Sequence, residues 1–227
     1  MAKPKRGNGA GGAGENPRDS GIGTGVGRAA AAARLHAGRT ALAHDLIRAG
    51  RILERRGMIV ATEGNMSARI TAERIIITRR GRRKGELTPR DFVEIGLAEA
   101  EGSQARAAAS TEHRMHLAAY VARPDIEALV HAHSPGLSAY AVRGEIPDVA
   151  ALDEAREFVR AIALVPYAQS GTEALGAAVT AALPGHDVLI LRNHGALAVG
   201  GSVEEALSKL EIAEHLAITL LLAERKG

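Results

Sequence analysis

The feature that most constrains the fold is a run of strand-like segments with no helix between them. MIVATEGNMSARI (58–70), ERIIITRRG (73–81) and DFVEIGL (91–97) follow one another directly, with a turn near Thr71 between the first two. Each is rich in residues that favour strands. Because helices and strands alternate elsewhere in the chain, the pattern favours an α/β fold, a three-layer α/β/α sandwich around a central mixed or antiparallel sheet.

The remaining periodicity supplies the helices and strands of this sandwich. Apolar residues near 3.6-residue spacing predict a helix from Arg28 to about Arg56. A second helix is expected over 110–124, with Ser110 or Thr111 as its cap and Pro124 just beyond its end. Further helices are expected at 135–143, 171–183 and 202–225, and strands at 128–134, 161–168 and on both sides of a turn in 187–200.

Composition narrows the class of protein. The net charge of +3 is matched by residues 1–28, where five basic residues face two acidic ones, so the rest of the chain is balanced. The high content of basic residues therefore does not indicate a nucleic-acid-binding protein. Residues 1–28 are expected to form a flexible Gly-rich tail, and residues 29–227 a single domain. No secretory signal or membrane-spanning run is present, so a cytoplasmic location is expected.

Histidines are the candidate metal ligands, because the chain has no cysteine. In VHAHSPG (130–136), His131 and His133 are two positions apart and would share one face of a strand. His194, in LRNHGAL, is the candidate third ligand, and Gly195 would allow a tight turn there. The alternative is that the two histidines lie on a solvated strand face.

Glu112 is the candidate catalytic carboxylate. It falls in the first turn of an expected helix, where the helix dipole favours a negative charge. It could act as a general base beside a metal or as a fourth ligand. The alternative is a surface pair with His116, four residues further on.

Two further segments carry candidate binding residues. ITRRGRRKGELT (77–88) contains five basic residues, which suit a solvated loop, nucleic acid or a small anion. Aromatic residues that would stack on bases are missing from it. TEGNMSAR (62–69) places Gly64 and Asn65 at an expected strand bend, either as an ordinary turn or as amides that hold an anion.

Taken together, these segments resemble the class II aldolase/adducin family. The resemblance runs from about residue 35 to 225 and rests on TEGNMSAR, ASTEHRMHLAAY, RPDIEALVHAHS, VPYAQSGT and LRNHGALAVG in the family's order. It implies an α/β/α sandwich, often assembled as a homotetramer with active sites between subunits. It also implies one divalent cation per subunit on His131, His133 and His194, most often zinc; manganese, cobalt and iron suit the same ligands.

The resemblance also implies roles for residues around the metal. Glu112 matches the family's acid/base glutamate. A small anionic substrate would be held by the residues that match the family's phosphate site and by the arginine before it: Asn65, Arg79, Arg80, Gly81, Ser110 and Thr111.

Two departures bear on the reaction. The family's sugar-phosphate aldolases have TPTG where this chain has TRRG, so Arg79 and Arg80 replace Pro and Thr. Of the two tyrosines that fuculose-phosphate aldolases use, one matches Ala151 and the other belongs to a C-terminal extension with no counterpart before Gly227.

The sequence therefore predicts a divalent-metal-dependent carbon–carbon lyase working through a metal-stabilised enolate. It favours a decarboxylase of a hydroxylated aromatic dicarboxylate, because that reaction needs no tyrosine proton donor. Sugar-phosphate aldol cleavage is the first alternative. A non-enzymatic adducin-like scaffold is the second, and the three retained histidines argue against it.

Overall fold

The computed structural model describes the backbone of residues 23–224 and the side chains of residues 37–224. The chain divides into two compact units, Met1–Leu35 and His36–Gly227. Helix α1 (Gly23–Arg55) begins before the expected start at Arg28. Residues 1–22 of the expected tail lie outside the described residues. The second unit contains the sheet and the candidate site.

A seven-stranded mixed sheet forms the centre of this unit. Its strands are β1 (Asn65–Thr71), β2 (Arg74–Thr78), β3 (Phe92–Gly96), β4 (Ala128–Ala132), β5 (Ile162–Val165), β6 (Val188–Leu191) and β7 (Gly195–Gly200). They are ordered β3-β2-β1-β4-β7-β6-β5, and only β5 and β6 are parallel neighbours within the described residues. The three consecutive strands of the sequence prediction thus form an antiparallel edge of the sheet, ending at β3.

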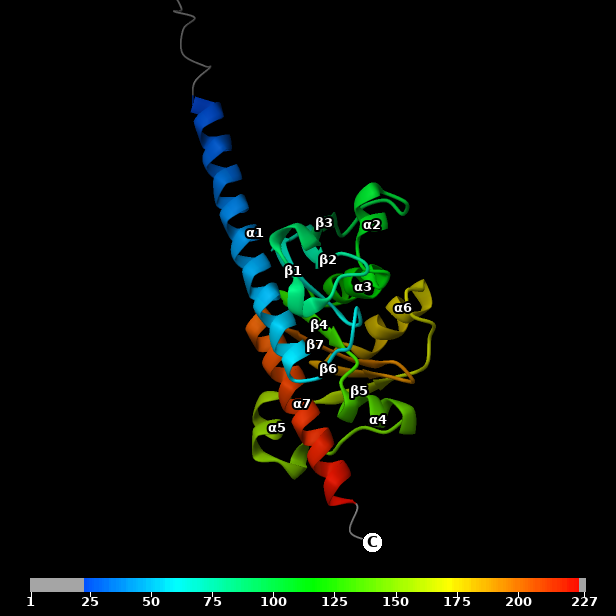
Figure 1. Ribbon diagram of the computed structural model, residues 1–227. Coiled ribbons are helices and arrows are strands. Elements are labelled where there is room, and N and C mark those ends of the chain that lie inside the picture. The colour runs from blue at the N-terminus through cyan, green and yellow to red at the C-terminus, as the bar shows by residue number, and fades with distance from the viewer. Residues whose placement is uncertain (1–22, 225–227) are drawn as a thin grey trace, which may run out of the picture. The chain divides into compact units, whose positions relative to one another are not determined.

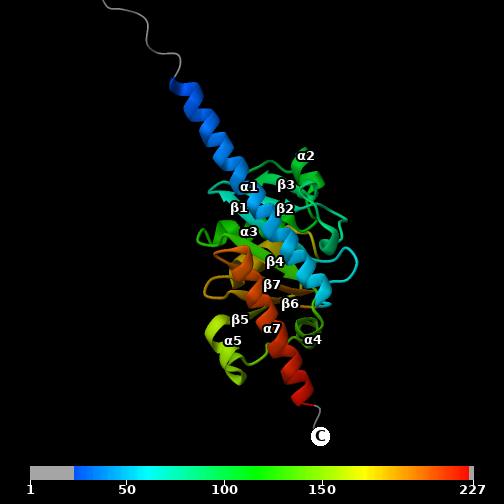
Figure 2. The ribbon, with the colours of Figure 1, turned by 60° about the vertical axis from the view of Figure 1, so that its left-hand side comes forward.

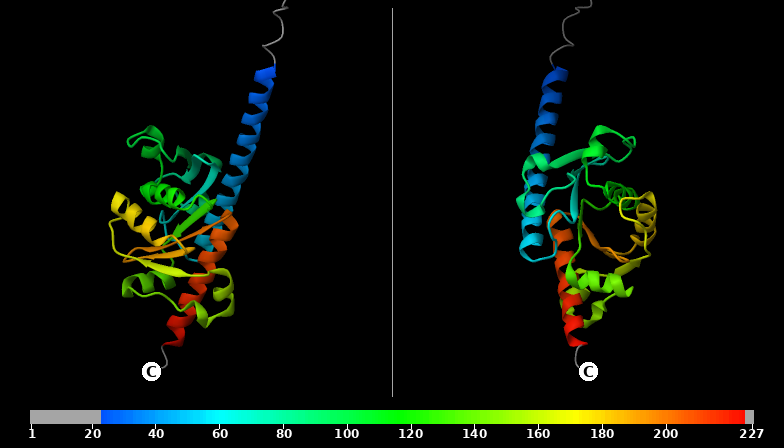
Figure 3. Two further views of the ribbon diagram at one scale, coloured as in Figure 1. Left: turned by 180° about the vertical axis from the view of Figure 1, so that it is seen from behind. Right: turned by 45° about the vertical axis from the view of Figure 1, so that its right-hand side comes forward.

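Helices cover both faces, which confirms the three-layer sandwich. One apolar cluster joins residues 43–53 of α1 with α4 (Pro135–Arg143), α5 (Asp153–Phe158) and α7 (Val203–Ala223). A second joins α3 (His113–Ala122) and α6 (Glu173–Ala182) to the opposite face. In Figure 1 and in the right-hand view of Figure 3, the strands separate α7 from α3 and α6, and in Figure 2, α7 passes in front of the strands. Side-chain alternation sets this division: Val130 belongs to the first cluster and Leu129 to the second.

Short helices complete the unit and bear on the site. The 3-10 helices Lys84–Glu86 and Pro89–Asp91 lie between β2 and β3, and Val149–Ala151 precedes α5. Helix α2 (Gln104–Ala108) follows β3. Within residues 23–224, every helix falls short of the length or the apolar character that a bilayer crossing requires.

Three sequence expectations were wrong in detail. The first strand begins at Asn65 and not at Met58, because turns occupy the segment around Gly64. Glu112, not Ser110 or Thr111, occupies the N-cap position of α3, so this carboxylate precedes the first helical turn. Strand β4 ends at Ala132, which leaves His133 just beyond it.

Helix α4 has an unusual cap that fixes the chain after His133. The side chain of Ser134, its N-cap residue, makes no capping hydrogen bond. Instead, the backbone N–H groups of Gly136 and Leu137 donate to the Glu214 carboxylate of α7 at 2.7 and 2.8 Å. Glu214 is buried, so its charge offsets the positive end of α4 inside the protein. Helix α7 thereby anchors the segment that carries His133.

Helix α7 is capped by side chains close to its own start. The Ser202 hydroxyl accepts from the Glu205 backbone N–H at 3.1 Å. The Glu205 carboxylate accepts a hydrogen bond from the Gly201 backbone N–H at 2.8 Å. It therefore pairs with the residue before Ser202 and not with the backbone N–H of Ser202 itself. It also accepts from Lys209 at 2.5 Å.

A candidate metal centre beside an anion-binding cavity

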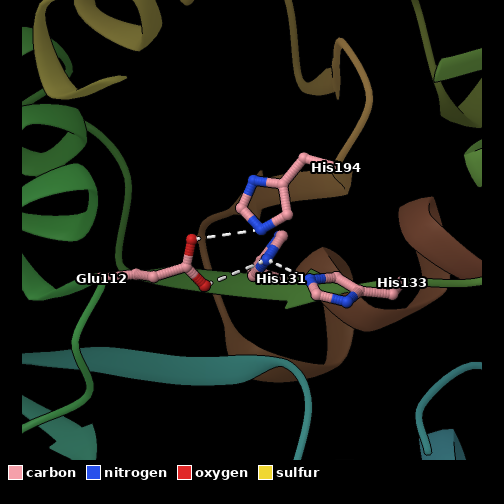
Figure 4. Close-up of side chains that lie close together, drawn as sticks. All are labelled: Glu112, His131, His133 and His194. Atoms are coloured by element: carbon pink, nitrogen blue, oxygen red, sulfur yellow. Dashed lines mark hydrogen bonds and ion pairs between the residues drawn. The ribbon is translucent and has the colours of Figure 1, made fainter. Parts of the chain in front are cut away.

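Four side chains from three parts of the fold converge at the α3 face of the sheet. His131 lies in β4, His133 follows that strand, His194 lies between β6 and β7, and Glu112 begins α3. Figure 4 shows the three imidazoles and the carboxylate pointing toward one another. One ligand atom from each lies within 4.8 Å of all the others. Among the described residues, this is the one such group of three or more histidine and acidic side chains.

The spacing of these atoms suits a tetrahedral divalent cation. The Nε2 atoms of His131 and His133 are 3.1 Å apart, and Glu112 oxygens lie 3.2 Å from His131 Nε2 and 3.3 Å from His194 Nε2. Two ligands of a tetrahedral zinc ion, each at about 2.0–2.1 Å, are about 3.4 Å apart.

The hydrogen bond of His131 also prepares it as a ligand. His131 Nδ1 donates to the Ala196 carbonyl at 2.9 Å, which directs the Nε2 lone pair of the neutral ring toward the cluster. His133 Nδ1 lies 3.6 Å from a Glu63 carboxylate oxygen. The residues present therefore fit a bound cation.

Electrostatics within the cluster support an ionised carboxylate. Burial favours the neutral acid, but His131, His194 and the hydrogen bond from Asn65 outweigh it and hold the pKa of Glu112 below its usual range. Burial lowers the pKa of His194 to about 4. Burial opposes a charge on His131 too, yet the nearby Glu112 raises the pKa of His131. Because a metal ligand must be a neutral imidazole, a bound cation would compete with a proton for His131.

A cavity of about 330 Å³ opens beside this cluster. All six residues expected to bind the substrate line it, together with Glu112, His133 and His194; His131 is fully buried. The other lining residues are Thr62, Glu63, Gly64, Lys84 and Ser170. The structure therefore places every sequence-predicted site residue in or next to one cavity.

Three basic side chains, those of Arg79, Arg80 and Lys84, line the cavity. The Arg79 Nε donates to the Arg90 carbonyl at 3.0 Å, which orients its guanidinium. Within the described part of the chain, the exposed Arg80 side chain forms no hydrogen bond or ion pair. Lys84 is buried, and its Nζ donates to the Thr62 and Arg82 carbonyls at 2.6 and 2.7 Å. Burial lowers the pKa of Lys84 to about 8, so it is still mostly charged at neutral pH.

Sequence reasoning missed Lys84 and Ser170 as individual site residues. Lys84 was one of five basic residues in a run that resembles a solvated loop, and nothing in that run marks it as buried. The Ser170 hydroxyl donates to Glu112 Oε1 at 2.8 Å from a loop, where no periodicity identifies it. The only signal was its place in VPYAQSGT, one of the segments that carried the family resemblance.

Two local interpretations were also wrong. Glu112 and His116 are not a surface pair, because both are buried. The turn before β7 depends on Asn193, whose φ is 55°, and not on a positive φ at Gly195. Gly195 matters for a different reason: a Cβ atom there would lie 2.6 Å from the Ala132 carbonyl oxygen and 2.7 Å from His133.

A larger hollow of about 540 Å³ lies elsewhere, between Arg56, α5 and α7. It is lined by Leu152, Glu154, Ala155, Ser208, Glu211, Ile212 and His215. No group of converging ligand atoms is found there among the described residues. The converging ligand atoms, and not the cavity volume, therefore identify the candidate site beside Glu112.

Comparison with known proteins agrees with the fold. The model of the Class II Aldolase and Adducin N-terminal domain matches residues 44–221. The chain therefore belongs to the class II aldolase/adducin family.

Similar proteins in this family include two kinds of enzyme. Methylthioribulose-1-phosphate dehydratase of Acidiphilium cryptum is 31% identical over 77% of this chain and 87% of its own. L-fuculose phosphate aldolase of Methanococcus maripaludis is 32% identical over 76% of this chain and 92% of its own. The crystal structure of L-fuculose-1-phosphate aldolase from Thermus thermophilus superposes with a TM-score of 0.72 at 30% identity, covering 82% of this chain and 97% of that one.

Proposed function

We propose that the chain is a divalent-metal-dependent lyase that acts on a small phosphorylated ketose, with zinc as the resident ion. The observation that carries the proposal is the convergence of three imidazoles and an ionised Glu112 beside a cavity lined by basic side chains. Relatives named as a sugar-phosphate dehydratase and as sugar-phosphate aldolases support this substrate class. They move the proposal away from the dicarboxylate that the sequence favoured.

The side chains that line the cavity include several that could bind the phosphate group of the substrate. Arg80, Gly81, Lys84, Ser110 and Thr111 all line the cavity. Hydroxyls, a free guanidinium and an ammonium are suitable partners for a phosphate. Their position beside the histidine cluster lets one small molecule reach both.

Glu112 is the proton carrier in this proposal. A bound divalent cation would act as a Lewis acid toward the carbonyl and hydroxyl oxygens of the substrate. Glu112 is ionised and accepts a proton from the carbon beside the carbonyl, then returns it to the departing hydroxide as water. In aldol cleavage, it instead accepts the proton of the hydroxyl group that becomes the aldehyde, and delivers this proton to the carbon that loses its aldehyde partner. Asn65 and Ser170 hold one carboxylate oxygen each, which fixes the direction of this transfer.

The test is product analysis with zinc-loaded protein. Methylthioribulose 1-phosphate and L-fuculose 1-phosphate are supplied separately and followed by ¹H and ³¹P NMR. Loss of water from the first, or splitting of the second into two carbonyl compounds, is the expected result. Glu112→Gln should retain the fold and lose at least about 100-fold in kcat. Absence of turnover for both substrates, with one zinc ion per chain, would contradict the proposal.

Decarboxylation is the second candidate, and the basic side chains favour it. Arg79, Arg80 and Lys84 all line the cavity, and three cations can hold a second carboxylate group. Release of carbon dioxide from hydroxylated aromatic dicarboxylates, measured with the same zinc-loaded protein, decides between the two candidates. Inactivity in both assays would favour the non-enzymatic scaffold.

Assembly and location are part of the same proposal. We infer a homotetramer, as the family resemblance implies, with the cavities near the contacts between subunits. Light scattering of the purified chain measures its mass directly, and a monomer at working concentration would refute this. A cytoplasmic location stays a prediction, which cell fractionation tests.

A further inference from the structure

A continuous chain of buried hydrogen bonds runs from α3 through β1 to the catalytic carboxylate. Tyr120 Oη lies 3.0 Å from Ser67 Oγ, which lies 2.7 Å from His116 Nδ1. His116 Nε2 lies 2.5 Å from Asn65 Oδ1, and Asn65 Nδ2 lies 2.7 Å from Glu112 Oε2. All five side chains are at least 95% buried. Solvent therefore does not compete for these bonds.

The spacing of these residues in the sequence explains how two elements build this chain. Glu112, His116 and Tyr120 are four residues apart, so they share one face of α3. Asn65 and Ser67 are two apart, so they share the face of β1 that meets α3. The four-residue spacing in α3 and the two-residue spacing in β1 place these polar side chains against one another, so that helix and strand residues alternate along the hydrogen-bonded chain. This polar seam crosses an otherwise apolar layer.

Each bond in the chain has a fixed direction. The ionised Glu112 carboxylate only accepts, so the amide nitrogen of Asn65 faces it. Asn65 Oδ1 then faces His116 and only accepts, so His116 carries its proton on Nε2. His116 Nδ1 must accept, so the Ser67 hydroxyl donates to it and itself accepts from Tyr120.

Burial supports this assignment of protons. It lowers the pKa of His116 to about 3, so the ring is neutral near pH 7. It raises the pKa of Tyr120 above its usual value, so the phenol keeps its proton as a donor.

We propose that His116 is a positioning residue, which locks the side-chain amide of Asn65 so that one N–H holds Glu112 and the other remains for the anionic group of the substrate. A reversed amide would point its carbonyl oxygen at the Glu112 carboxylate, where two acceptors repel. It would also place N–H groups against the Nε2–H of His116. The Nε2–H tautomer and the Glu112 carboxylate together permit a single amide orientation, although the His116 side chain belongs neither to the ligand cluster nor to the cavity lining.

Catalytic measurements test this role and rest on the proposed function. His116→Leu removes the donor and should lower kcat by about 10–100-fold while one zinc ion per chain is retained. His116→Gln can place an amide N–H near the Nε2 position and should recover most of the loss. Ser67→Ala removes the donor to Nδ1 and should give an intermediate loss. Ser138→Ala is the matched control, because its hydroxyl is buried without a hydrogen-bond partner among the described residues. Wild-type kcat in His116→Leu would overturn the proposal.

Histidine NMR gives a readout that needs neither a substrate nor a folded leucine variant. In zinc-loaded, ¹⁵N-histidine-labelled full-length protein, His116 is assigned by its disappearance in His116→Gln. The expected ring is neutral, protonated on Nε2 and unchanged between pH 6 and 9. A ring protonated on Nδ1, or a charged ring at pH 7, would overturn the proposal even if the enzyme is active. The expected tautomer in a chain inactive on every phosphoketose would refute the proposed function and leave the assigned orientation standing.

Discussion

Gly195→Ala should weaken metal binding through a single added methyl group. A Cβ atom at this first residue of β7 would lie 2.6 Å from the Ala132 carbonyl oxygen and 2.7 Å from His133 Cδ2, where ordinary contact begins at 3.4 Å. The strand and the ring must therefore separate by 0.8 and 0.7 Å, the differences between those distances. Overpacking of this kind costs about 1–3 kcal/mol of stability.

The displacement of the His133 ring is expected to have the larger effect on function, because it changes zinc affinity. Metal–ligand distances tolerate only about 0.2 Å, so a shift several times larger at His133 should reduce zinc affinity at least about tenfold. The cost in stability should lower Tm by about 2–12 °C, at about 2–4 °C per kcal/mol for a unit of this size. Competition with a chromogenic chelator measures the affinity, and melting with and without zinc measures the stability.

The matched control is Gly38→Ala. A Cβ atom at this residue of α1 has no atom within 4 Å, so zinc affinity should be unchanged. Its Tm should rise slightly, since alanine is favoured over glycine in helices by about 1 kcal/mol. Wild-type zinc affinity in Gly195→Ala would refute the argument that close packing of β7 against His133 sets the ligand geometry.

Three further outcomes are expected. Arg80→Ala should raise KM for a phosphorylated substrate about tenfold, because the substrate loses one charge-assisted hydrogen bond at an exposed position, while kcat stays within about twofold. An unchanged KM would contradict a role of Arg80 in binding the substrate. Burial lowers the pKa of Lys84 to about 8, so KM should rise as the pH passes through about 8 and the ammonium loses its proton; a Lys84→Met variant that keeps this pH dependence would exclude Lys84 as its source. Glu214→Leu leaves two buried N–H groups of α4 unpaired and should cost about 3 kcal/mol, or about 6–12 °C in Tm, with a smaller loss in Glu214→Gln; equal Tm values would show that the cap is not stabilising.

The order of helices and strands could be predicted because local patterns carry it. The segment ALVHAHSPG combines a short apolar run with a proline that begins a helix, and β4 and α4 follow this pattern closely. The four central residues of the candidate site were also identifiable, because the ordered set of segments that resembles the family is more specific than any one of its short motifs. These predictions need no knowledge of distant contacts.

Burial and hydrogen-bond partners could not be predicted, because they depend on how elements pack. Spacing alone made Glu112 and His116 a surface pair, yet α3 turns this face toward β1. Lys84 is buried because α1 approaches its backbone closely: a Cβ atom at Gly50 would lie 2.2 Å from the Lys84 carbonyl oxygen. Neither contact leaves a local signal in the sequence. The long-range cap from Glu214 to α4 has the same character, since 77 positions separate Leu137 from its acceptor.

The sheet order separates the parts of the site in a way that bears on evolution. The proposed metal ligands His131, His133 and His194 come from β4 and the residue just beyond it, and from the connection between β6 and β7, in the interior of the sheet. Arg79, Arg80 and Lys84 come from the connection between β2 and the edge strand β3. Substitutions in the connection between β2 and β3 could therefore change which substrate binds, while the residues of the proposed metal site stay the same. A single scaffold of this kind can diversify into enzymes that share one chemistry and differ in the molecules they accept.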